Sequence, residues 1–339
     1  MSIVMTGGGT GGHLAIIQAV KESLKEEDLI YIGSTTGQDR QWFEQDKDFV
    51  ERYFLSTRGV VNQGIVGKVT SLLKILLSAL KVRKIFKTHQ VSVVFSVGGF
   101  ASAPAVIASK LAGIPLVIHE QNASIGSLNK LFKPFAHTFI SSYLEESPIK
   151  AYPIKSIFFD NARIRTTVKT IIFLGGSQGA KAINDLALLL APKLKAQGIK
   201  IIHQAGQRNI DAVNKAYKDI GIEAEVFGFT THLAKYMQEA DFAVARAGAS
   251  TLWELSATAL PTLYIPYPYA ASDHQYHNAQ FLVSKDLAWL MRENNVDALK
   301  VMALLDKDLS IVSHGLVEMV EKEGSAKIAQ KLLEIQKDI

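Results

Sequence analysis

The sequence predicts an α/β protein of two Rossmann-like domains, each built on a doubly wound parallel sheet. Two observations lead to this prediction. A short apolar strand at residues 3–5 runs directly into a glycine-rich loop and a helix, and the same order starts again at residue 170. After each start, apolar runs of strand length alternate with helical patterns, as they do in βαβ units. A chain of 339 residues is long for one domain and comfortable for two.

Composition limits the class of protein further. Hydrophobic residues make up 48% of the chain and charged residues 20%, which is typical of a globular protein with well-filled cores. The absence of cysteine excludes disulfides and thiolate metal sites and is compatible with a reducing compartment. The first strand begins almost at the N-terminus without a charged leader, so we expect no signal peptide. No apolar stretch reaches the length of a membrane-spanning helix.

The charges are distributed unevenly. Residues 52–119 contain nine Lys or Arg and no Asp or Glu, so this segment carries a charge of +9. Because the net charge of the chain is +5, the rest of the chain carries −4. Within it, residues 69–86 form a Leu- and Ile-rich helical pattern whose charges are all positive. Two interpretations stay open: a crossover helix with a solvated basic face, or a helix that also touches an anionic membrane. Nucleic acid is less favoured, because aromatic residues are not interleaved with the charges.

The first glycine loop, residues 7–12, holds five glycines and opens onto a helix N-terminus. Glycine lets a ligand approach the backbone closely, and the unpaired N–H groups of the helix favour an anion. We therefore expect a phosphate or pyrophosphate here, against the alternative of a βα turn without ligand. The loop matches the dinucleotide fingerprint formally, but no acidic residue follows the second strand before Asp39, so NAD is not favoured. His13 stands where a P-loop needs lysine.

Apolar periodicity and glycine or proline breaks place the other elements of the first domain. The expected elements are a strand at 29–32, a polar, partly aromatic helix with its connections at 39–54, a loop at 59–67, a helix at 69–86, a strand at 91–95, a second glycine loop at 96–104, a helix ending at 112, a strand at 115–118 and a last strand near 140. The polar cluster His119, Glu120, Gln121 and Asn122 follows the strand at 115–118. Open α/β sheets build their sites at such strand ends.

The second domain repeats this plan after a linker at 151–170. Strands are expected at 170–174, 200–203, 224–227, 242–244 and 261–265, with a glycine loop at 175–180, an apolar helix at 183–194, a loop turning into a helix at 246–255, a polar-aromatic loop at 266–278 and an amphipathic C-terminal helix at 326–339. Ser250 or Thr251 is the expected cap of the helix after the 246–249 loop. The domains are expected at 1–155 and 156–325, with helix 326–339 a candidate to pack back on the first.

Six motifs in order make a family resemblance. They are the GGTGGH segment at 8–13, VGGFASAP at 97–104, HEQN at 119–122, GGSQGA at 175–180, RAGA through Glu254 at 246–254, and DHQ to Asn-Ala at 273–279. Together they closely resemble the MurG family, bacterial transferases that convert lipid I to lipid II in peptidoglycan synthesis. The resemblance spans nearly the whole chain.

The resemblance implies a glycosyltransferase of the two-Rossmann (B) type. Its activity would be inverting transfer of N-acetylglucosamine from UDP-GlcNAc to the C4 hydroxyl of the N-acetylmuramoyl group of lipid I. It implies no cofactor and a peripheral location on the cytoplasmic face of the bacterial inner membrane. Its partners would be UDP-GlcNAc, lipid I and an anionic membrane surface. The rivals are another two-Rossmann UDP-sugar enzyme, transferase or epimerase, and a non-catalytic nucleotide-sugar-binding protein.

Carried over residue by residue, the resemblance implies a substrate-binding set. Its members are Thr10, Gly11, Gly12, Asn122, Ser177, Thr230, Ala249, Ser250, Thr251, Leu252, Trp253, Glu254 and Gln275. Glu254 would accept the ribose hydroxyls, Ser177 would lie near the diphosphate, and Gln275 with Asn278 would bind sugar hydroxyls. Where the family has Asn-Pro-Val-Arg at the domain junction, this chain has Tyr-Pro-Ile-Lys at 152–155, so the arginine contact to the diphosphate does not carry over, and Lys155 is a candidate point-charge substitute.

His13 is the candidate general base, because it follows the first glycine loop and should begin a helix. The positive helix end disfavours imidazolium, so we expect a neutral ring that accepts the proton of the attacking hydroxyl. Two alternatives stay open: His13 binds the acceptor phosphates, or Glu120 is the base. Glu120 could instead hold the acceptor or a nearby histidine. The Asp-x-Asp pairs at 46–48 and 306–308 are expected on solvated helix faces, and no metal site is expected.

Overall fold

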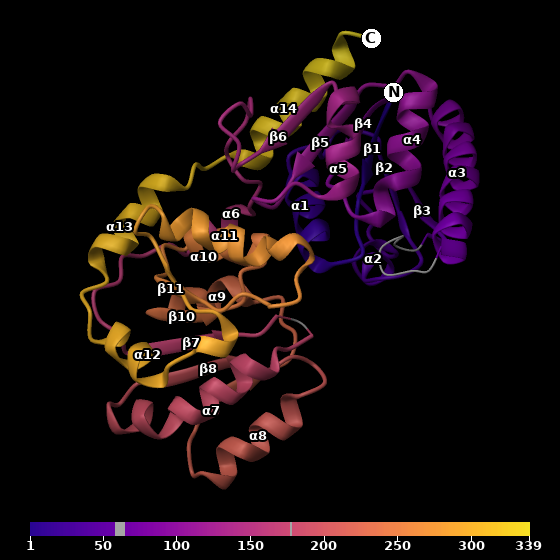
Figure 1. The fold of residues 1–339 in the computed structure, drawn as a ribbon. Coiled ribbons are helices and arrows are strands. Elements are labelled where there is room, and N and C mark those ends of the chain that lie inside the picture. Colours follow the sequence, from indigo (N-terminus) through magenta and orange to yellow (C-terminus); the bar gives the residue numbers. More distant parts are fainter. Residues whose placement is uncertain (58–64, 177) are drawn as a thin grey trace. The chain divides into compact units, whose positions relative to one another are not determined.

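The computed structural model describes residues 1–57, 65–176 and 178–339, and the chain divides into two compact units (Figure 1). The first unit comprises residues 1–154 together with 321–339, and the second comprises 155–320. The C-terminal helix α14 (Gly324–Lys337) therefore belongs to the first unit, where it packs against α1 (Gly11–Lys21) and β4 (Val91–Ser96). Among the described residues, no helix is both long and apolar enough to cross a membrane.

The first unit is built on a parallel sheet of order β3-β2-β1-β4-β5-β6. Besides β4, its strands are β1 (Ser2–Thr6), β2 (Leu29–Ser34), β3 (Glu51–Leu55), β5 (Leu116–Glu120) and β6 (Thr138–Ser141). Besides α1 and α14, its helices are α2 (Asp39–Phe43), α3 (Ile65–Thr88), the 3₁₀ turn η1 (Phe100–Ser102), α4 (Ala103–Ala112), α5 (Ser127–Phe132) and the 3₁₀ turn η2 (Lys133–Phe135). Helices α3 and α4 lie side by side (Figure 1) and share a core with the central strands.

The strand order positions the site. From β1 the chain runs outward to β3 and then returns to β4 on the other side of β1. The connections that follow β1 and β4 therefore lead in opposite directions along the sheet from its carboxyl edge, which is where open α/β sheets bind ligands. Both strands are buried along their whole length, as expected for central parallel strands.

Residues 39–54 differ from the prediction. The expected polar helix is only the short α2, and an edge strand, β3, occupies Glu51–Leu55. Edge strands are half exposed, so β3 lacks the continuous apolar run that marks a buried strand. Of the loop expected at 59–67, residues 65–67 are the start of α3, and residues 59–64 lie outside the described part of the chain.

The second unit repeats the topology with the sheet order β12-β11-β10-β7-β8-β9. Its strands are β7 (Thr170–Leu174), β8 (Lys200–Gln204), β9 (Glu225–Phe227), β10 (Phe242–Ala245), β11 (Thr262–Tyr264) and β12 (Trp289–Leu290). Its helices are α6 (Ser156–Asp160), α7 (Lys181–Ala196), α8 (Ile210–Asp219), α9 (Leu233–Glu239), α10 (Ala249–Ala257), η3 (Ala271–Asp273), α11 (His274–Val283), η4 (Glu293–Asn295), α12 (Ala298–Leu305) and α13 (Ser310–Met319). Its switch point lies between β7 and β10, and the prediction of two doubly wound domains is confirmed.

Two local predictions in the second unit are wrong. The segment 266–278 is not all loop, because α11 begins at His274 after a turn in which Ser272 and Asp273 have φ of +53° and +50°. Asp273 forms a two-pronged ion pair with Arg292, at 2.7 and 3.0 Å, which holds that turn. The cap of α10 is Gly248, so Ser250 and Thr251 lie inside the helix and do not cap it.

Candidate functional site

The first glycine loop is shaped from inside the protein by Asp39, the first residue of α2. Its Oδ2 accepts a hydrogen bond from the backbone N–H of Gly9 at 2.7 Å, and its Oδ1 accepts one from the N–H of Ser34 at 2.8 Å. The hydroxyl of Tyr31 lies 3.0 Å from Oδ1 and donates to the carbonyl of Gly7 at 2.8 Å. Asp39 is fully buried, so this acid organises the loop and is unsuited to bind the ribose of a dinucleotide.

The second glycine loop packs directly on the first through its residues 97–99. Gly98 and Gly99 have φ of +84° and +79°, which glycine adopts without strain. A Cβ on Gly99 would lie 2.8 Å from the carbonyl oxygen of Gly8 and 3.5 Å from Cε1 of His13. Any side chain at residue 99 would therefore push the two loops apart, and its Cβ would touch the ring of His13 at van der Waals distance.

His13 is the third residue of α1 and is partly exposed. Its Nδ1 lies 2.9 Å from the hydroxyl of Thr10, the residue that precedes the helix. Its Nε2 lies 2.9 Å from the carboxamide nitrogen of Gln121, just beyond β5. The structure thus places the predicted base at a helix N-terminus with both ring nitrogens held. Gln121 is absent from the predicted site, although its place in a polar cluster at a strand end was a usable signal.

Glu120, the alternative base, has its carboxylate occupied by the loop that follows β5. Oε1 accepts from the N–H of Asn122 at 2.9 Å, and Oε2 accepts from the N–H of Gly126 at 2.9 Å. The side-chain amide of Asn129 also donates to Oε2, at 2.8 Å. Glu120 is only 2% exposed, so the geometry favours a loop anchor over a base. Asn122, from the predicted substrate set, is thereby held at the start of this loop.

Asn129 and His119 complete the surroundings and were not predicted as site residues. A Cβ on Gly98 would lie 2.8 Å from Nδ2 of Asn129, so this buried amide supports the second glycine loop as well as Glu120. His119 is fully buried beside the ring of Tyr152, and neither of its ring nitrogens has a hydrogen-bond partner. Burial, with a smaller contribution from the charge of His13, lowers the pKa of His119 to about 3, so this ring stays neutral.

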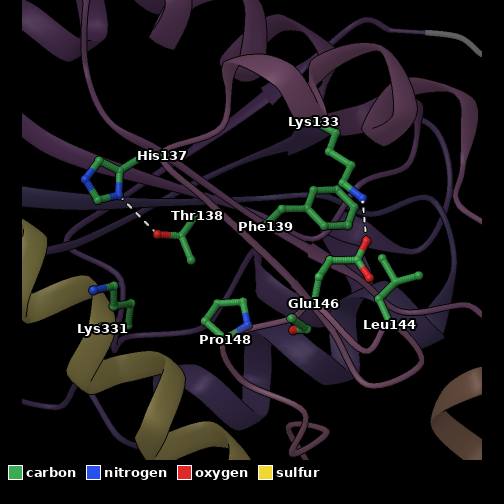
Figure 2. Close-up of a pocket in the computed structure, with 9 residues that line it drawn as sticks. Lys133, His137, Thr138, Phe139, Leu144, Glu146, Pro148 and Lys331 are labelled. Carbon is green, nitrogen blue, oxygen red and sulfur yellow. Dashed lines mark hydrogen bonds and ion pairs between the residues drawn. The ribbon is translucent and has the colours of Figure 1, made fainter.

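A hollow of about 450 Å³ lies elsewhere on the first unit (Figure 2). It is lined by residues at the start of β6, by the 144–148 segment and by Lys331 of α14. Lys133 and Glu146 pair across it at 3.1 Å, and His137 lies 3.1 Å from the hydroxyl of Thr138 (Figure 2). None of the predicted site residues lines it, so we do not assign it to the predicted site.

In the second unit, the glycine loop after β7 packs against the end of β8. Gly179 has φ of +80°, and a Cβ there would lie 2.6 Å from the side-chain amide of Asn209. The N–H of Gly176 donates to Oε1 of Gln204 at 3.2 Å. Ser177, the predicted diphosphate contact, lies outside the described residues.

Helix α10 divides the predicted donor residues into two groups. Ser250, Thr251 and Glu254 are partly exposed, whereas Ala249, Leu252 and Trp253 are buried. The buried three can reach a ligand only through their backbone, and Trp253 instead packs on Phe281 with ring centroids 5.9 Å apart. Because α10 begins at Ala249, its first-turn N–H groups have no carbonyl partner within the helix and can bind an anion.

The carboxyl group of Glu254 lies in the second turn of α10. Loss of solvent around it raises its pKa to about 8, and the positive charge of Lys155 opposes that rise. The residue as a whole remains partly exposed. Lys155, the predicted substitute for the family arginine, therefore acts electrostatically on Glu254.

The loop between β11 and α11 is held by polar side chains. Oε1 of Gln275 accepts from the N–H of Tyr267 at 2.9 Å, which leaves the amide nitrogen as its donor end. Arg246 donates to the carbonyl oxygens of Ile265 and Pro266, each at 3.0 Å. Thr230, the remaining predicted contact, is partly exposed and accepts from the N–H of His232 at 3.0 Å.

Asn278 corrects the prediction of a sugar-binding side chain. It is fully buried, and its Nδ2 donates to the carbonyl of Ala247 at 3.1 Å. The amide of Asn278 therefore supports the backbone just before α10. A sugar hydroxyl cannot approach a side chain that is closed off in this way.

The two Asp-x-Asp pairs lie in turns, so the prediction that they lie on helix faces is wrong. Asp46 and Asp48 both form ion pairs with the buried Lys21, at 2.5 and 2.7 Å. Asp308 accepts from the N–H of Ser310 at 2.9 Å, at the start of α13. Within the described residues, no three metal-ligating side chains gather in one place.

Two doubly wound units with glycine loops and helix N-termini at their carboxyl edges are the architecture of glycosyltransferases of the B type. The chain belongs to glycosyltransferase family 28: the N-terminal domain of that family matches residues 3–141 and the C-terminal domain matches residues 170–333.

Named relatives and solved structures agree with this family. A Sulfurovum sp. protein named UDP-N-acetylglucosamine--N-acetylmuramyl-(pentapeptide) pyrophosphoryl-undecaprenol N-acetylglucosamine transferase is 71% identical over 332 residues, 98% of each chain. A Campylobacter jejuni protein of the same name is 49% identical and also covers 98% of each chain. The crystal structure of Acinetobacter baumannii MurG superposes with a TM-score of 0.78 at 25% identity, over 98% of this chain and 99% of that one. The predicted family is confirmed.

Proposed function

We propose that this protein is an inverting glycosyltransferase that moves N-acetylglucosamine from UDP-GlcNAc to the C4 hydroxyl of the N-acetylmuramoyl group of lipid I, giving lipid II. The observation that carries the proposal is the 71% identity, across 98% of both chains, to a relative named as an N-acetylglucosamine transferase acting on UDP-N-acetylglucosamine and N-acetylmuramyl-(pentapeptide) pyrophosphoryl-undecaprenol. At 98% coverage of both chains, the match spans both units.

The second unit is the proposed donor site. The first-turn N–H groups of α10 bind the diphosphate, with the glycine loop after β7 as the second group of donors. The carboxylate of Glu254 accepts hydrogen bonds from the ribose hydroxyls, and the amide nitrogen of Gln275 donates to a hydroxyl of the sugar. As the sugar leaves UDP, the same N–H groups stabilise the charge that develops on the diphosphate, and no cofactor is needed.

The first unit supplies the proposed base. The C4 oxygen of the acceptor attacks the anomeric carbon from the face opposite UDP, and His13 takes the hydroxyl proton as the new bond forms. The electron pair of the broken carbon–oxygen bond leaves with UDP, which inverts the anomeric centre. Thr10, Gly11 and Gly12, at the start of the same helix, are the proposed contacts of this unit to UDP-GlcNAc.

Helix α3 is the proposed contact with the anionic surface of the inner membrane, on its cytoplasmic face. One side of the helix packs inward through Ile75, Ala79, Val82 and Phe86. The opposite side exposes five leucines, each by 47–60%: Leu72, Leu73, Leu76, Leu77 and Leu80. Lys74, Lys81, Arg83, Lys84 and Lys87 are exposed on the same helix. Exposed leucines flanked by lysine and arginine fit a helix that lies in the lipid interface.

The test measures UDP release from UDP-GlcNAc with and without a lipid I analogue, with product identified by mass. Acceptor-dependent UDP and a product heavier by one N-acetylhexosamine support the proposal. Conversion of UDP-GlcNAc without acceptor would contradict it and indicate an epimerase. Transfer to a soluble sugar alone would contradict it in favour of a transferase with a different acceptor, and donor binding without turnover would indicate a nucleotide-sugar-binding protein.

A further inference from the structure

The two ring nitrogens of His13 have partners of different exposure. Nδ1 lies 2.9 Å from the hydroxyl of Thr10, an exposed residue. Nε2 lies 2.9 Å from the carboxamide nitrogen of Gln121, a residue only 7% exposed. An incoming hydroxyl can therefore displace the hydroxyl of Thr10 at Nδ1 more easily than it can displace the buried amide at Nε2.

The carboxamide decides which ring nitrogen carries the proton. A neutral imidazole has one N–H and one lone pair, and the partner of one nitrogen fixes the state of the other. With the amide nitrogen of Gln121 at Nε2, as in the structure, the ring proton sits on Nδ1 and neither lone pair is available to a hydroxyl. A half-turn of the carboxamide brings its oxygen to Nε2, moves the ring proton there and opens the lone pair of Nδ1.

The carboxamide oxygen itself is a second observation. Oε1 of Gln121 is buried and has no hydrogen-bond partner, which is unusual for a buried polar atom. The half-turn would give this oxygen the Nε2–H of His13 as its donor. Glutamine suits this place because it carries a donor and an acceptor on one rotating group.

We propose that Gln121 is a positioning residue of the transfer reaction, whose carboxamide oxygen holds the Nε2–H of His13 so that Nδ1 takes the proton of the acceptor hydroxyl. This inference rests on the proposed function. In the step, the proton passes from the C4 oxygen to Nδ1, the C4 oxygen bonds to the anomeric carbon, and UDP leaves with the electron pair of the old bond. The imidazolium, held by Oε1 at Nε2–H, then returns its proton to water.

The titratable groups on the elements around His13 have other hydrogen-bond partners or are neutral. The carboxylate of Glu120 is directed to the loop and amide donors after β5, and that of Asp39 to the first glycine loop and Ser34. His119 is buried and neutral. The carboxamide of Gln121 therefore plays the part that a carboxylate plays in other histidine-based sites.

The test reads the tautomer of His13 directly by nitrogen NMR on the full-length protein labelled at histidine, with His13 assigned from a His13→Asn sample. In the free wild type we expect the proton on Nδ1, as the amide orientation dictates. In Gln121→Glu, which offers only acceptor oxygens, we expect it on Nε2 and expect the pKa of His13 to rise by about 1–3. The exposed Gln330→Leu is the control and should match wild type. A proton that remains on Nδ1 in Gln121→Glu, as in wild type, would overturn the proposal, because an acceptor oxygen at residue 121 would then fail to hold Nε2–H.

Kinetics give an independent readout. Gln121→Leu should lower kcat at least tenfold with the KM for UDP-GlcNAc unchanged, whereas Gln121→Glu should retain kcat within about tenfold, with the acid limb of its pH profile moved upward. A kcat within threefold of wild type for Gln121→Leu would count against a positioning role. If Gln121→Leu does not fold, Gln121→Asn, whose carboxamide is one carbon shorter, replaces it. If the chain transfers no sugar at all, the proposed function fails while the NMR result still decides the tautomer.

Discussion

The backbone N–H of Gly9 donates to the buried carboxylate of Asp39, 30 residues later in the chain, at 2.7 Å. The same carboxylate accepts from Ser34 at the end of β2, so it ties the loop after β1 to the neighbouring strand. Gly8 lies against this carboxylate and leaves no room for a Cβ. The shape of the glycine loop, and with it the start of the helix that carries His13, thus depends on one buried side chain.

Asp39→Asn should therefore destabilise the first unit. The side-chain amide of asparagine would turn an N–H group toward at least one of the donors that now donate to the carboxylate. Loss of a hydrogen bond to a charged group costs about 1.5–3 kcal/mol. We expect a fall in Tm of about 3–12 °C, measured by calorimetry. Asp48→Asn is the matched control, because Asp48 is 69% exposed and its pair with Lys21 should contribute at most about 1 kcal/mol. Equal Tm values for the two variants would contradict the role given to Asp39.

Glu120→Gln separates a loop anchor from a base. An anchor that loses one of its acceptor positions should cost about 1.5–3 kcal/mol in stability and raise the KM for the lipid acceptor, while kcat changes less than about tenfold. A base would instead lose kcat by about 10²-fold or more with stability intact. Urea unfolding and steady-state kinetics on the same variant distinguish the two. Glu146→Gln, which alters an exposed glutamate paired with Lys133, is the control and should leave both measurements unchanged.

The topology is predictable from the sequence because its signals are local. Apolar runs such as residues 170–174 and glycine loops directly after them mark buried parallel strands wherever they occur. The edge strand β3 escapes prediction, since it begins with two charged residues and its apolar run is only three residues long. The start of α11 escapes for a different reason, because a left-handed turn at Ser272 and Asp273, held by the distant Arg292, decides where that helix begins.

The candidate site is predictable as a set of loops but not as a set of contacts. The position of His13 follows from the glycine loop before it. Its contact with Gln121 joins residues 108 positions apart, and no local pattern encodes such a pairing. The burial of Asn278 and the occupied carboxylate of Glu120 are likewise products of tertiary packing, so the sequence could suggest a sugar contact and a base but not that both side chains are already occupied.

Donor binding should depend on pH through Glu254, whose pKa is raised to about 8 by loss of solvent. Ribose hydroxyls donate to the ionised form, of which only about a tenth exists at pH 7, so the affinity for UDP-GlcNAc should rise about tenfold between pH 7 and pH 9. Calorimetric titrations at pH 7, 8 and 9 measure this rise. Glu254→Gln should bind more weakly and without the pH dependence. A wild-type Kd that is constant over this range would remove Glu254 from the ribose site.

The stability of the folded protein should also depend on pH through Glu254. The folded protein holds the proton of Glu254 more tightly than the unfolded chain, whose glutamate has its ordinary value of 4.5. The contribution of Glu254 to stability is therefore fully present below pH 4.5 and is lost as the pH rises toward 8. Glu254→Gln removes that loss, so the difference in Tm between variant and wild type should grow in the variant's favour from pH 5 to pH 8.

Membrane binding should require both the leucines and the cations of α3. Lys81→Glu with Lys84→Glu should lower binding to vesicles containing phosphatidylglycerol at least about tenfold, since each basic residue near an anionic surface contributes about 1 kcal/mol. Leu76→Gln with Leu77→Gln should weaken binding to the same vesicles through loss of apolar contact. Leu189→Gln, at a leucine 66% exposed in the second unit, is the control. Flotation that is equal on neutral and anionic vesicles would exclude the electrostatic contribution.

The last prediction concerns His13 itself. Proton transfer by a positioned side chain contributes about 10²–10⁴-fold to a rate, so His13→Ala should lower kcat by that factor. Binding of UDP-GlcNAc should be nearly unchanged, because the proposed contacts to its ribose, diphosphate and sugar belong to the second unit. A rise only in the acceptor KM would show that His13 binds the acceptor phosphates. In that case the kcat of Glu120→Gln decides whether Glu120 is the base. A large loss of kcat in that variant would assign the base to Glu120 and require its carboxylate to leave Gly126 and Asn129 during the reaction. Modest losses of kcat in both His13→Ala and Glu120→Gln would mean that neither side chain is the base.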